Sequence, residues 1–295
     1  MDRVEAPAAR PVHLGVSATE VRGRAIGALI SDRRHLSPEQ IEKILSHQRK
    51  KGMRFGEAAI SLGLASADDV LAALSQQFHY PYDRRERSAE LVALTQPFSP
   101  QAEAFRALRS QVMMRLNTDA DSRRALAVIS PDSGDGKSFF AANLAVTLAQ
   151  LGGRTLLVDG DLRGPRQHEI FGVPNQVGLS SMLSGRHDAS AVQQIDGISS
   201  LYLLPVGATP PNPLELLDRP AFALMMRELV TGFDHVVVDT PAAVYGADAS
   251  VIASRCGAAL ILARRNESRL ADLQELLRQL DGAAAQVLGV IVNEH

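Results

Sequence analysis

The sequence has one cysteine, no large excess of either charge and no long apolar run. Because a single cysteine, Cys256, cannot form an internal disulfide, we predict a reducing compartment. The small apolar residues around it favour a buried, unreactive thiol. The formal net charge of −2 gives no support to electrostatic capture of nucleic acid, and no nucleic-acid partner is expected.

Signals for export and for membrane insertion are also missing. Residues 1–15 contain Ala and Pro but no apolar core followed by a cleavage site, so we expect no secretory signal. No uninterrupted apolar run approaches the length of a membrane span. We therefore predict a cytoplasmic protein whose association with the inner membrane requires a partner.

The 295 residues are enough for two domains, each with its own core. Residues 1–20 lack periodicity and are predicted to form a flexible tail. Apolar residues at helical spacing predict a small, mostly α-helical domain over residues 21–82. Charges followed by prolines predict a linker with a short helix over residues 83–99. The second domain is expected to span residues 100–295.

The predicted helical domain contains an internal repeat. Gly27 aligns with Gly56, and Gln48 aligns with Gln77, with apolar residues at matching positions between them. Ser37 is followed by a proline, which is typical of an N-cap and the first position of a helix. Five segments of helical length are therefore expected in this small domain, which ends near Tyr82.

From Ala125 on, short apolar runs alternate with helical patterns. Such alternation is typical of a parallel sheet wrapped by helices, and we predict an α/β fold of this kind. The expected strands are Leu126 to Ile129, Thr155 to Val158, Leu201 to Leu204, Val236 to Val238, Ala259 to Leu262 and Val287 to Val292.

A glycine-rich loop, Ser-Pro-Asp-Ser-Gly-Asp-Gly-Lys-Ser at residues 130–138, joins the first apolar run to a helical pattern. Such loops bind phosphates because glycines let backbone N–H groups face the anion, and the helix N-terminus adds positive potential. Lys137 is expected to reach the β- and γ-phosphates, and Ser138 to bind magnesium. Pro131 stands where the strict pattern has glycine. The simpler alternative is a glycine turn that only caps a helix.

Acidic residues end two other predicted strands, at the edge where open α/β sheets bind ligands. Asp159 and Asp161 follow one strand, and Asp239 follows another. Asp239 suits water-mediated binding of magnesium, and the other two can complete the metal shell, one of them accepting a proton from an attacking hydroxyl. Any one of these carboxylates alone could simply cap the next helix. Three of them behind a phosphate loop favour a catalytic site.

Residues 130–138, 156–163 and 236–241 together resemble the Walker A, A′ and B motifs of bacterial tyrosine kinases of exopolysaccharide export. The likeness covers residues 100–293. The related Min/Par ATPases usually carry a second lysine at the place of Asp132, so its absence here favours the kinase branch.

The resemblance implies an ATP- and magnesium-dependent protein tyrosine kinase that regulates polysaccharide polymerisation and chain length. The implied catalytic residues are Lys137, Asp159 and Asp161. The implied metal ligands are Ser138, Asp159, Asp161 and Asp239. The implied nucleotide contacts are Ser133, Gly134, Asp135, Gly136, Lys137, Ser138, Phe139, Arg163 and, for the adenine, Asn293.

The same resemblance implies partners. Glu103, Arg106 and Arg109 resemble the family's E-x-x-R-x-x-R oligomerisation motif, whose spacing places the three charges along one side of a helix. A homo-oligomeric ring is therefore expected, and a solvated charged helix face is the alternative. A transmembrane polysaccharide co-polymerase is the implied activator.

The chain departs from these kinases at its end. The family's tyrosine-rich tail is missing, and the tyrosines of this sequence are Tyr80, Tyr82, Tyr202 and Tyr245. We therefore expect no phosphorylation of a tail, so tyrosine kinase activity either acts elsewhere or has been lost. Two alternatives stay open: a Min/Par-like switch that hydrolyses ATP, and a scaffold that binds ATP without turnover.

The repeat of the helical domain resembles the N-terminal domain of type II secretion and pilus ATPases, some of which bind cyclic di-GMP. The matching residues are Arg54, Phe55, Gly56, Gly63 and Gln77 in the second copy, and Gly27 and Gln48 in the first. Ala25 and Arg34 depart from the motif in the first copy. The alternative is a protein-docking domain in which the apolar positions form a plain core.

Overall fold

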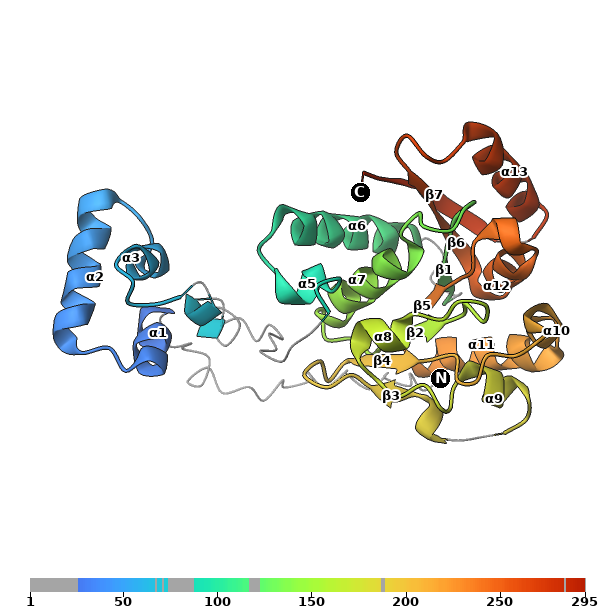
Figure 1. Ribbon diagram of the computed structural model, residues 1–295, viewed down its shortest axis with the longest axis horizontal. Helices are drawn as coiled ribbons and strands as arrows, with labels where there is room; N and C mark the ends of the chain where they lie inside the picture. Colours follow the sequence, from blue (N-terminus) through green and yellow to red (C-terminus); the bar gives the residue numbers. More distant parts are fainter. Residues whose placement is uncertain are drawn as a thin grey trace, which may run out of the picture. The chain divides into compact units, whose positions relative to one another are not determined.

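The computed structural model describes residues 26–66, 68–70, 72–73, 88–116, 123–186, 189–283 and 285–294. The chain forms two compact units, one up to Tyr80 and one from Pro81 on (Figure 1). The predicted tail lies outside the described residues, as do Gln77, Tyr80 and Tyr82. Within the described ranges, no helix is both long and apolar enough to cross a bilayer.

The amino-terminal unit is helical where it is described, as predicted. Its helices are α1 (Ile26–Arg34), α2 (Pro38–Lys51) and α3 (Phe55–Ser61), and residues 68–70 and 72–73 are also helical. Ser37 caps α2 in a reciprocal pair with Gln40: the backbone N–H of Gln40 donates to Ser37 Oγ at 3.3 Å, and the Ser37 N–H donates to Gln40 Oε1 at 2.9 Å.

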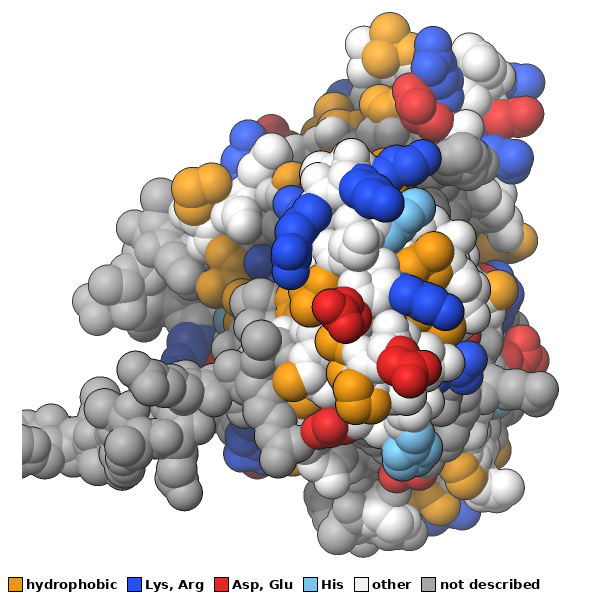
Figure 2. Space-filling model, turned by 90° about the vertical axis from the view of Figure 1, so that its left-hand side faces the viewer, with side chains coloured by type: hydrophobic (Ala, Val, Ile, Leu, Met, Phe, Trp, Pro, Cys, Tyr) orange, Lys and Arg blue, Asp and Glu red, His pale blue; other side chains and the backbone are white. Residues whose placement is uncertain are grey.

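Apolar residues from all three helices fill the core of this unit, among them Ile30, Ile44 and Ala58. The polar side of α2 carries opposite charges at its two ends, with Glu39 in the first turn and Arg49, Lys50 and Lys51 in the last. Figure 2 shows the face of this unit, where the Lys and Arg side chains gather toward one end. This arrangement complements the helix dipole, which stabilises cations near the C-terminus.

A seven-stranded sheet of order β3-β4-β2-β5-β1-β6-β7 forms the centre of the second unit (Figure 1). Neighbouring strands are parallel except β3 and β4. The strands are β1 (Ala125–Ile129), β2 (Thr155–Asp159), β3 (Gln193–Gln194), β4 (Leu201–Leu204), β5 (His235–Asp239), β6 (Gly257–Arg264) and β7 (Gln286–Asn293). All six predicted strands are confirmed. The sequence missed β3, which is polar and only two residues long.

Helices cover both faces of this sheet. They are α5 (Val92–Thr95), α6 (Pro100–Leu116), α7 (Lys137–Ala149), α8 (Gln167–Phe171), α9 (Leu179–Leu183), α10 (Pro213–Leu217), α11 (Pro220–Gly232), α12 (Asp248–Cys256) and α13 (Leu270–Asp281), with short 3-10 turns η1 (Ala189–Ala191) and η2 (Ala243–Tyr245). On β1, Leu126 and Val128 belong to one core, whereas Ala127 and Ile129 belong to the other. Burial on both faces explains why the strands read as continuous apolar runs.

Cys256, the last residue of α12, is buried, as the sequence predicts. Burial raises the pKa of its thiol above the ordinary value. Because the thiolate is the reactive form, the fold suppresses nucleophilic chemistry at this residue.

The described part of the predicted linker packs on the second unit. Leu91 to Leu94 are buried in the core that surrounds α7. Asn143 of α7, fully buried, accepts a hydrogen bond from the N–H of Ala93 at 2.9 Å and donates to the carbonyl of Glu90 at 2.7 Å. A buried amide therefore fixes residues 88–95 to the helix that follows the phosphate loop.

Replacing Asn143 with Ala removes both of these hydrogen bonds. We expect the free energy of unfolding to fall by about 2 kcal/mol, since each buried hydrogen bond contributes about 1 kcal/mol net. Urea denaturation followed by circular dichroism measures this. The matched substitution at exposed Asn212 is expected to change stability by less than about 0.5 kcal/mol. Equal effects of the two substitutions would contradict an anchoring role for Asn143.

Candidate nucleotide-binding site

The phosphate loop lies between β1 and α7, as predicted. Gly134 and Gly136 have φ values of 88° and 93°, a left-handed conformation that glycine adopts without strain. Gly136 precedes α7, and no side chain caps the helix there. The first N–H groups of α7 are therefore available to an anion at the loop, and the thirteen-residue helix adds its dipole.

Lys137 is nearly buried, with 7% of its surface exposed. Its Nζ donates to Ser130 Oγ at 2.9 Å and to the Asp132 carbonyl at 3.1 Å. Burial lowers the pKa of Lys137, while the charges of Asp239 and Asp135 act in the opposite direction. The lysine is thus a cation held in place by the loop that is predicted to bind phosphate.

Asp135 and Asn293 brace the loop from behind. The Asp135 carboxylate accepts hydrogen bonds from the Asp132 N–H at 3.0 Å and from Ser268 Oγ at 3.1 Å. The Asn293 amide donates to the Asp135 carbonyl at 3.1 Å, and a Cβ at Gly136 would lie only 2.6 Å from Asn293 Nδ2. Both residues were predicted to contact the nucleotide, and the structure shows that they shape the loop.

Asp159 and Asp239 lie side by side at the ends of β2 and β5. Asp159 is fully buried, and its oxygens accept hydrogen bonds from the backbone N–H groups of Asp161 at 3.3 Å, Arg166 at 3.2 Å and Gln167 at 3.0 Å. It therefore fixes the loop that leads into α8. Burial, followed by the charge of Asp239, raises the pKa of Asp159 well above the ordinary value.

Asp239 is also fully buried, and Gln167 orients it. The Gln167 amide donates to Asp239 Oδ2 at 2.7 Å and to the Ser138 carbonyl at 3.0 Å. Burial raises the pKa of Asp239 to about 6, and the charge of Asp161 raises it as well. Hydrogen bonds from Ser138 and Gln167 lower the pKa but do not offset burial. Sequence reasoning missed Gln167, because nothing in the motifs shows that its side chain crosses to another strand.

The donor set at this edge fits a magnesium ion. Asp239 Oδ1 is buried and accepts no hydrogen bond from the residues that the structure describes. Ser138 and Asp161 line a pocket at this edge of the sheet. Hydroxyl and carboxylate oxygens are the ligands that magnesium prefers, usually alongside water and substrate phosphates. Among the described residues, no group of three or more His, Cys, Asp or Glu could hold a metal alone. Magnesium bound here would accordingly depend on phosphate oxygens.

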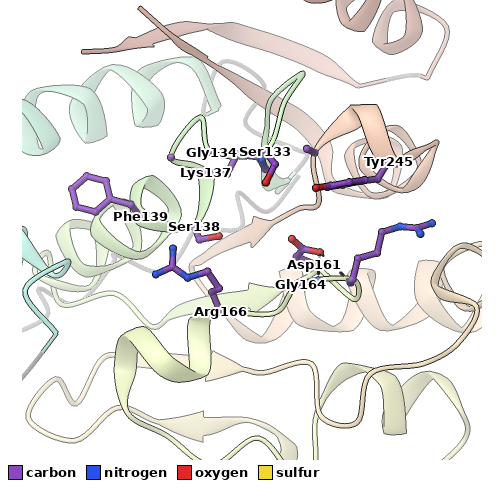
Figure 3. A pocket seen from close by; sticks show the side chains of 12 residues that line it. Ser133, Gly134, Lys137, Ser138, Phe139, Asp161, Gly164, Arg166 and Tyr245 are labelled. Atoms are coloured by element: carbon purple, nitrogen blue, oxygen red, sulfur yellow. Dashed lines mark hydrogen bonds between the residues drawn. The ribbon is translucent and has the colours of Figure 1, made fainter. Parts of the chain in front are cut away.

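A pocket of about 640 Å³ opens between the phosphate loop and the loop after β2 (Figure 3). Ser138 and Asp161 face it from opposite sides, while the ring of Phe139 points away from Asp161. The lining residues are Ser133, Gly134, Gly136, Lys137, Ser138, Phe139, Asp161, Arg163, Gly164, Arg166, Ala242 and Tyr245. The structure thus brings most of the predicted nucleotide-binding residues together in one pocket.

Two arginines add positive charge to this pocket. Arg163, which was predicted to bind nucleotide, forms an ion pair with buried Asp248 of α12 at 3.0 Å. Arg166 was not predicted; it pairs with Glu90 at 2.8 Å and keeps about half of its side chain exposed. Arg166 closely follows Asp161 and Arg163 in the sequence, and this position could have indicated that it lies at the same pocket.

A second cavity, of about 540 Å³, shares Phe139 with the first pocket as a lining residue. Phe139 and Phe105 line it with an edge-to-face contact, their ring centroids 5.8 Å apart. Ile291, Val292 and Asn293 of β7 complete the lining on another side. A ligand with its phosphates in the first pocket and a planar apolar group in this cavity would contact aromatic and aliphatic side chains here.

The predicted oligomerisation residues lie on α6. Arg106 forms an ion pair with Glu103 at 2.5 Å and also donates to the carbonyl of Pro97. Arg109 donates to the carbonyl of Thr147 on α7 at 2.9 Å. Both arginines therefore make contacts within the chain, while 72% of the Glu103 side chain is exposed.

The described residues of the predicted cyclic di-GMP site have structural roles in the amino-terminal unit. A Cβ at Gly27 would lie 3.5 Å from the Phe55 ring, and one at Gly56 would lie 2.8 Å from Val70 Cγ1. These glycines permit close packing of helices. Gly63 has a φ of 66°, and Arg54 is the N-cap residue of α3. Gln48 accepts the C-cap hydrogen bond of α2 through its carbonyl, and Gln77 lies outside the described residues.

A parallel sheet, a glycine-rich loop before α7 and carboxylates at neighbouring strand ends together define a P-loop nucleotide-binding protein. The family of CobQ/CobB/MinD/ParA nucleotide binding domains (CbiA) matches residues 126–295. The chain is 36% identical over 202 residues to CapB of Staphylococcus aureus, provisionally named a tyrosine-protein kinase; the match covers 67% of this chain and 86% of CapB. This chain belongs to the CobQ/CobB/MinD/ParA family, in its branch of bacterial tyrosine-protein kinases.

Two further comparisons support this placement. The chain is 32% identical to the tyrosine-protein kinase Wzc of Salmonella typhimurium over 71% of its own length, but it spans only 29% of Wzc. The kinase domain of the Escherichia coli tyrosine kinase Etk superposes with a TM-score of 0.66 at 28% identity, covering 72% of this chain and 82% of that domain.

Proposed function

We propose that the second unit binds ATP with magnesium and transfers the γ-phosphoryl group to a tyrosine hydroxyl. The convergence of Lys137, Ser138 and Asp161 on one pocket carries this proposal. Phosphoryl transfer needs positioning and charge neutralisation more than covalent chemistry by the protein, and these side chains supply both. Because the relatives are named tyrosine-protein kinases, we propose a tyrosine hydroxyl as the acceptor.

Each residue has a role in this proposal. Lys137 neutralises charge on the β- and γ-phosphates, and Ser138 with Asp239 would hold the magnesium ion, which neutralises further charge when bound. Asp161 accepts the proton of the attacking hydroxyl, because it lines the pocket and takes backbone N–H groups on Oδ1 alone, whereas both oxygens of Asp159 accept them. Asp159 acts through the loop that it fixes.

The cavity beside Phe139 is the proposed site of the adenine. The Phe105 and Phe139 rings give apolar surface, and the Asn293 side chain offers a polar group at the edge. Asn293 also donates a hydrogen bond to the Asp135 carbonyl of the phosphate loop. It would therefore contact both the adenine and the loop that holds the phosphates.

The same kinase proposal includes assembly and a partner. Glu103, Arg106 and Arg109 would contact a neighbouring copy in a ring, for which the exposed carboxylate of Glu103 is the available group. A transmembrane polysaccharide co-polymerase would recruit the protein to the cytoplasmic face of the inner membrane and activate it. Through this activity the protein would regulate exopolysaccharide polymerisation, export and chain length.

The experiment is incubation of the purified chain with magnesium and γ-labelled ATP, with a Glu–Tyr copolymer as acceptor and with or without the cytosolic tail of the co-polymerase. Labelled phosphotyrosine supports the kinase. Free phosphate without phosphotyrosine selects a Min/Par-like ATPase switch. Tight ATP binding without turnover, even with the tail present, selects a non-catalytic scaffold.

Cyclic di-GMP binding by the amino-terminal unit stays a prediction from its resemblance to secretion ATPases. Close helix packing accounts for Gly27 and Gly56 without a ligand, which supports the alternative of a docking domain. Titration calorimetry of the full chain with cyclic di-GMP, beside an Arg54→Ala variant, distinguishes the two. Absence of heat from the unaltered chain would eliminate the ligand.

A further inference from the structure

The segment that follows β5 is tied to the phosphate loop. In η2, the N–H of Ala243 donates to the carbonyl of Ser130 at 2.9 Å, and the N–H of Val244 donates to the carbonyl of Pro131 at 3.0 Å. These bonds connect the residues after Asp239 to the start of the loop that cradles phosphate. The backbone of the residue that follows is therefore held beside the nucleotide site.

That next residue is Tyr245. It lines the same pocket as Lys137, Ser138 and Asp161, and 54% of its surface is exposed. In Figure 3 its ring extends from η2 into the space between Ser133 and Asp161, with the hydroxyl at the inner end. Tyr245 belongs to neither hydrophobic core of this unit, so core packing does not explain its position.

The other described tyrosine has a different environment. Tyr202 of β4 is half-buried, its ring lies edge-to-face on Phe233 at 5.3 Å between centroids, and the guanidinium of Arg154 lies over it at 5.5 Å. These contacts hold the Tyr202 ring within the fold. Of the tyrosines that the structure describes, Tyr245 alone lines the nucleotide pocket.

We propose that Tyr245 is a phosphorylation site of this chain, modified in cis by the chain's own nucleotide site; this inference rests on the proposed kinase function. The Tyr245 oxygen attacks the γ-phosphorus, a new O–P bond forms, and the bond from that phosphorus to the β–γ bridging oxygen breaks with its electrons leaving on ADP. The phenolic proton passes to the Asp161 carboxylate and then to water. The products are ADP and phosphotyrosine 245.

The pocket also suits the product. A phosphotyrosine carries close to two negative charges, and Lys137, Arg163 and Arg166 line the same space. Arg163 would exchange its ion pair with Asp248, which lies three residues after Tyr245, for the new phosphate. Planar guanidinium groups bind phosphate through paired hydrogen bonds.

Phosphopeptide mapping by tandem mass spectrometry tests this site. The full chain is incubated with ATP and magnesium in the presence of the Glu–Tyr copolymer, beside the Lys137→Met and Tyr245→Phe variants. We expect phosphate on the peptide that contains Tyr245 of the unaltered chain, and its complete loss from that peptide in both variants. The rate constant for modification is expected to stay the same as the protein is diluted, since the reaction is intramolecular.

The copolymer separates the two possible failures. Copolymer phosphorylation that depends on Lys137 without phosphate at Tyr245 overturns this inference and leaves the kinase intact. No phosphate on either acceptor overturns both. Mixing the unaltered chain with the Lys137→Met chain adds a last arm, in which phosphate on Tyr245 of the Lys137→Met chain would overturn modification in cis.

Discussion

Lys137→Met is expected to lower phosphoryl transfer from ATP by about 10²- to 10³-fold, the usual effect of removing one preorganised group that stabilises transition-state charge. Lys137 is nearly buried and already held by Ser130 and the Asp132 carbonyl, so its charge has a defined position at the phosphate loop. Methionine keeps most of the length and the apolar stem of the side chain but removes the charge and the hydrogen bonds to Ser130 Oγ and the Asp132 carbonyl. Initial rates of labelled phosphate transfer measure the effect.

Lys50→Met is the matched control, because Lys50 is exposed on the last turn of α2 in the other unit. Its rate is expected to equal that of the unaltered chain. Thermal unfolding of both variants shows whether the fold is retained. If the Lys137→Met chain folds normally and keeps full activity, the phosphate loop does not take part in the mechanism as proposed.

The fold of the second unit could be predicted from the sequence because its strands are buried on both faces. Such strands read as unbroken apolar runs, and the six that the sequence shows are the six long strands of the sheet. The phosphate loop was predictable for a related reason, since glycines at Gly134 and Gly136 are required by the left-handed backbone there.

What the sequence did not reveal depends on contacts between distant segments. Leu91 to Leu94 looked like a linker because the anchoring amide, Asn143, lies on a helix about fifty residues later. Gln167 looked like an ordinary helix residue, although its side chain reaches Asp239 from another strand. The roles of Asp159 and Asp161 could not be told apart either, since only the structure shows that backbone donors engage both oxygens of Asp159 but a single oxygen of Asp161.

Asp239→Asn is expected to stabilise the protein without nucleotide while it removes magnesium-dependent activity. Burial raises the pKa of Asp239 to about 6 from an ordinary value of 3.8. The folded state therefore holds a proton on this carboxyl more tightly than the unfolded chain does. The associated stability is fully present below the unfolded pKa, is lost as pH rises from 3.8 to about 6, and is absent at neutral pH.

Asparagine has the same shape but no charge to bury, and its carbonyl oxygen can still accept the hydrogen bond of Gln167. At pH 7.5 the gain in unfolding free energy is expected to be at most about 3 kcal/mol, from a shift of about two pKa units at about 1.4 kcal/mol each. At pH 5 the gain is expected to be smaller, because part of the Asp239 population is then protonated. Thermal unfolding at the two pH values measures this difference.

Asp218→Asn makes the same chemical change at an exposed position and is expected to leave stability within about 0.5 kcal/mol at both pH values. The activity of the unaltered chain is expected to fall as pH drops through about 6, because protonated Asp239 no longer supplies a negative ligand for magnesium. A destabilised Asp239→Asn chain would mean that the ionised carboxylate is compensated in the fold, most directly by Lys137. In that case Lys137→Met would destabilise the protein as well, since it would leave the buried carboxylate without its cation.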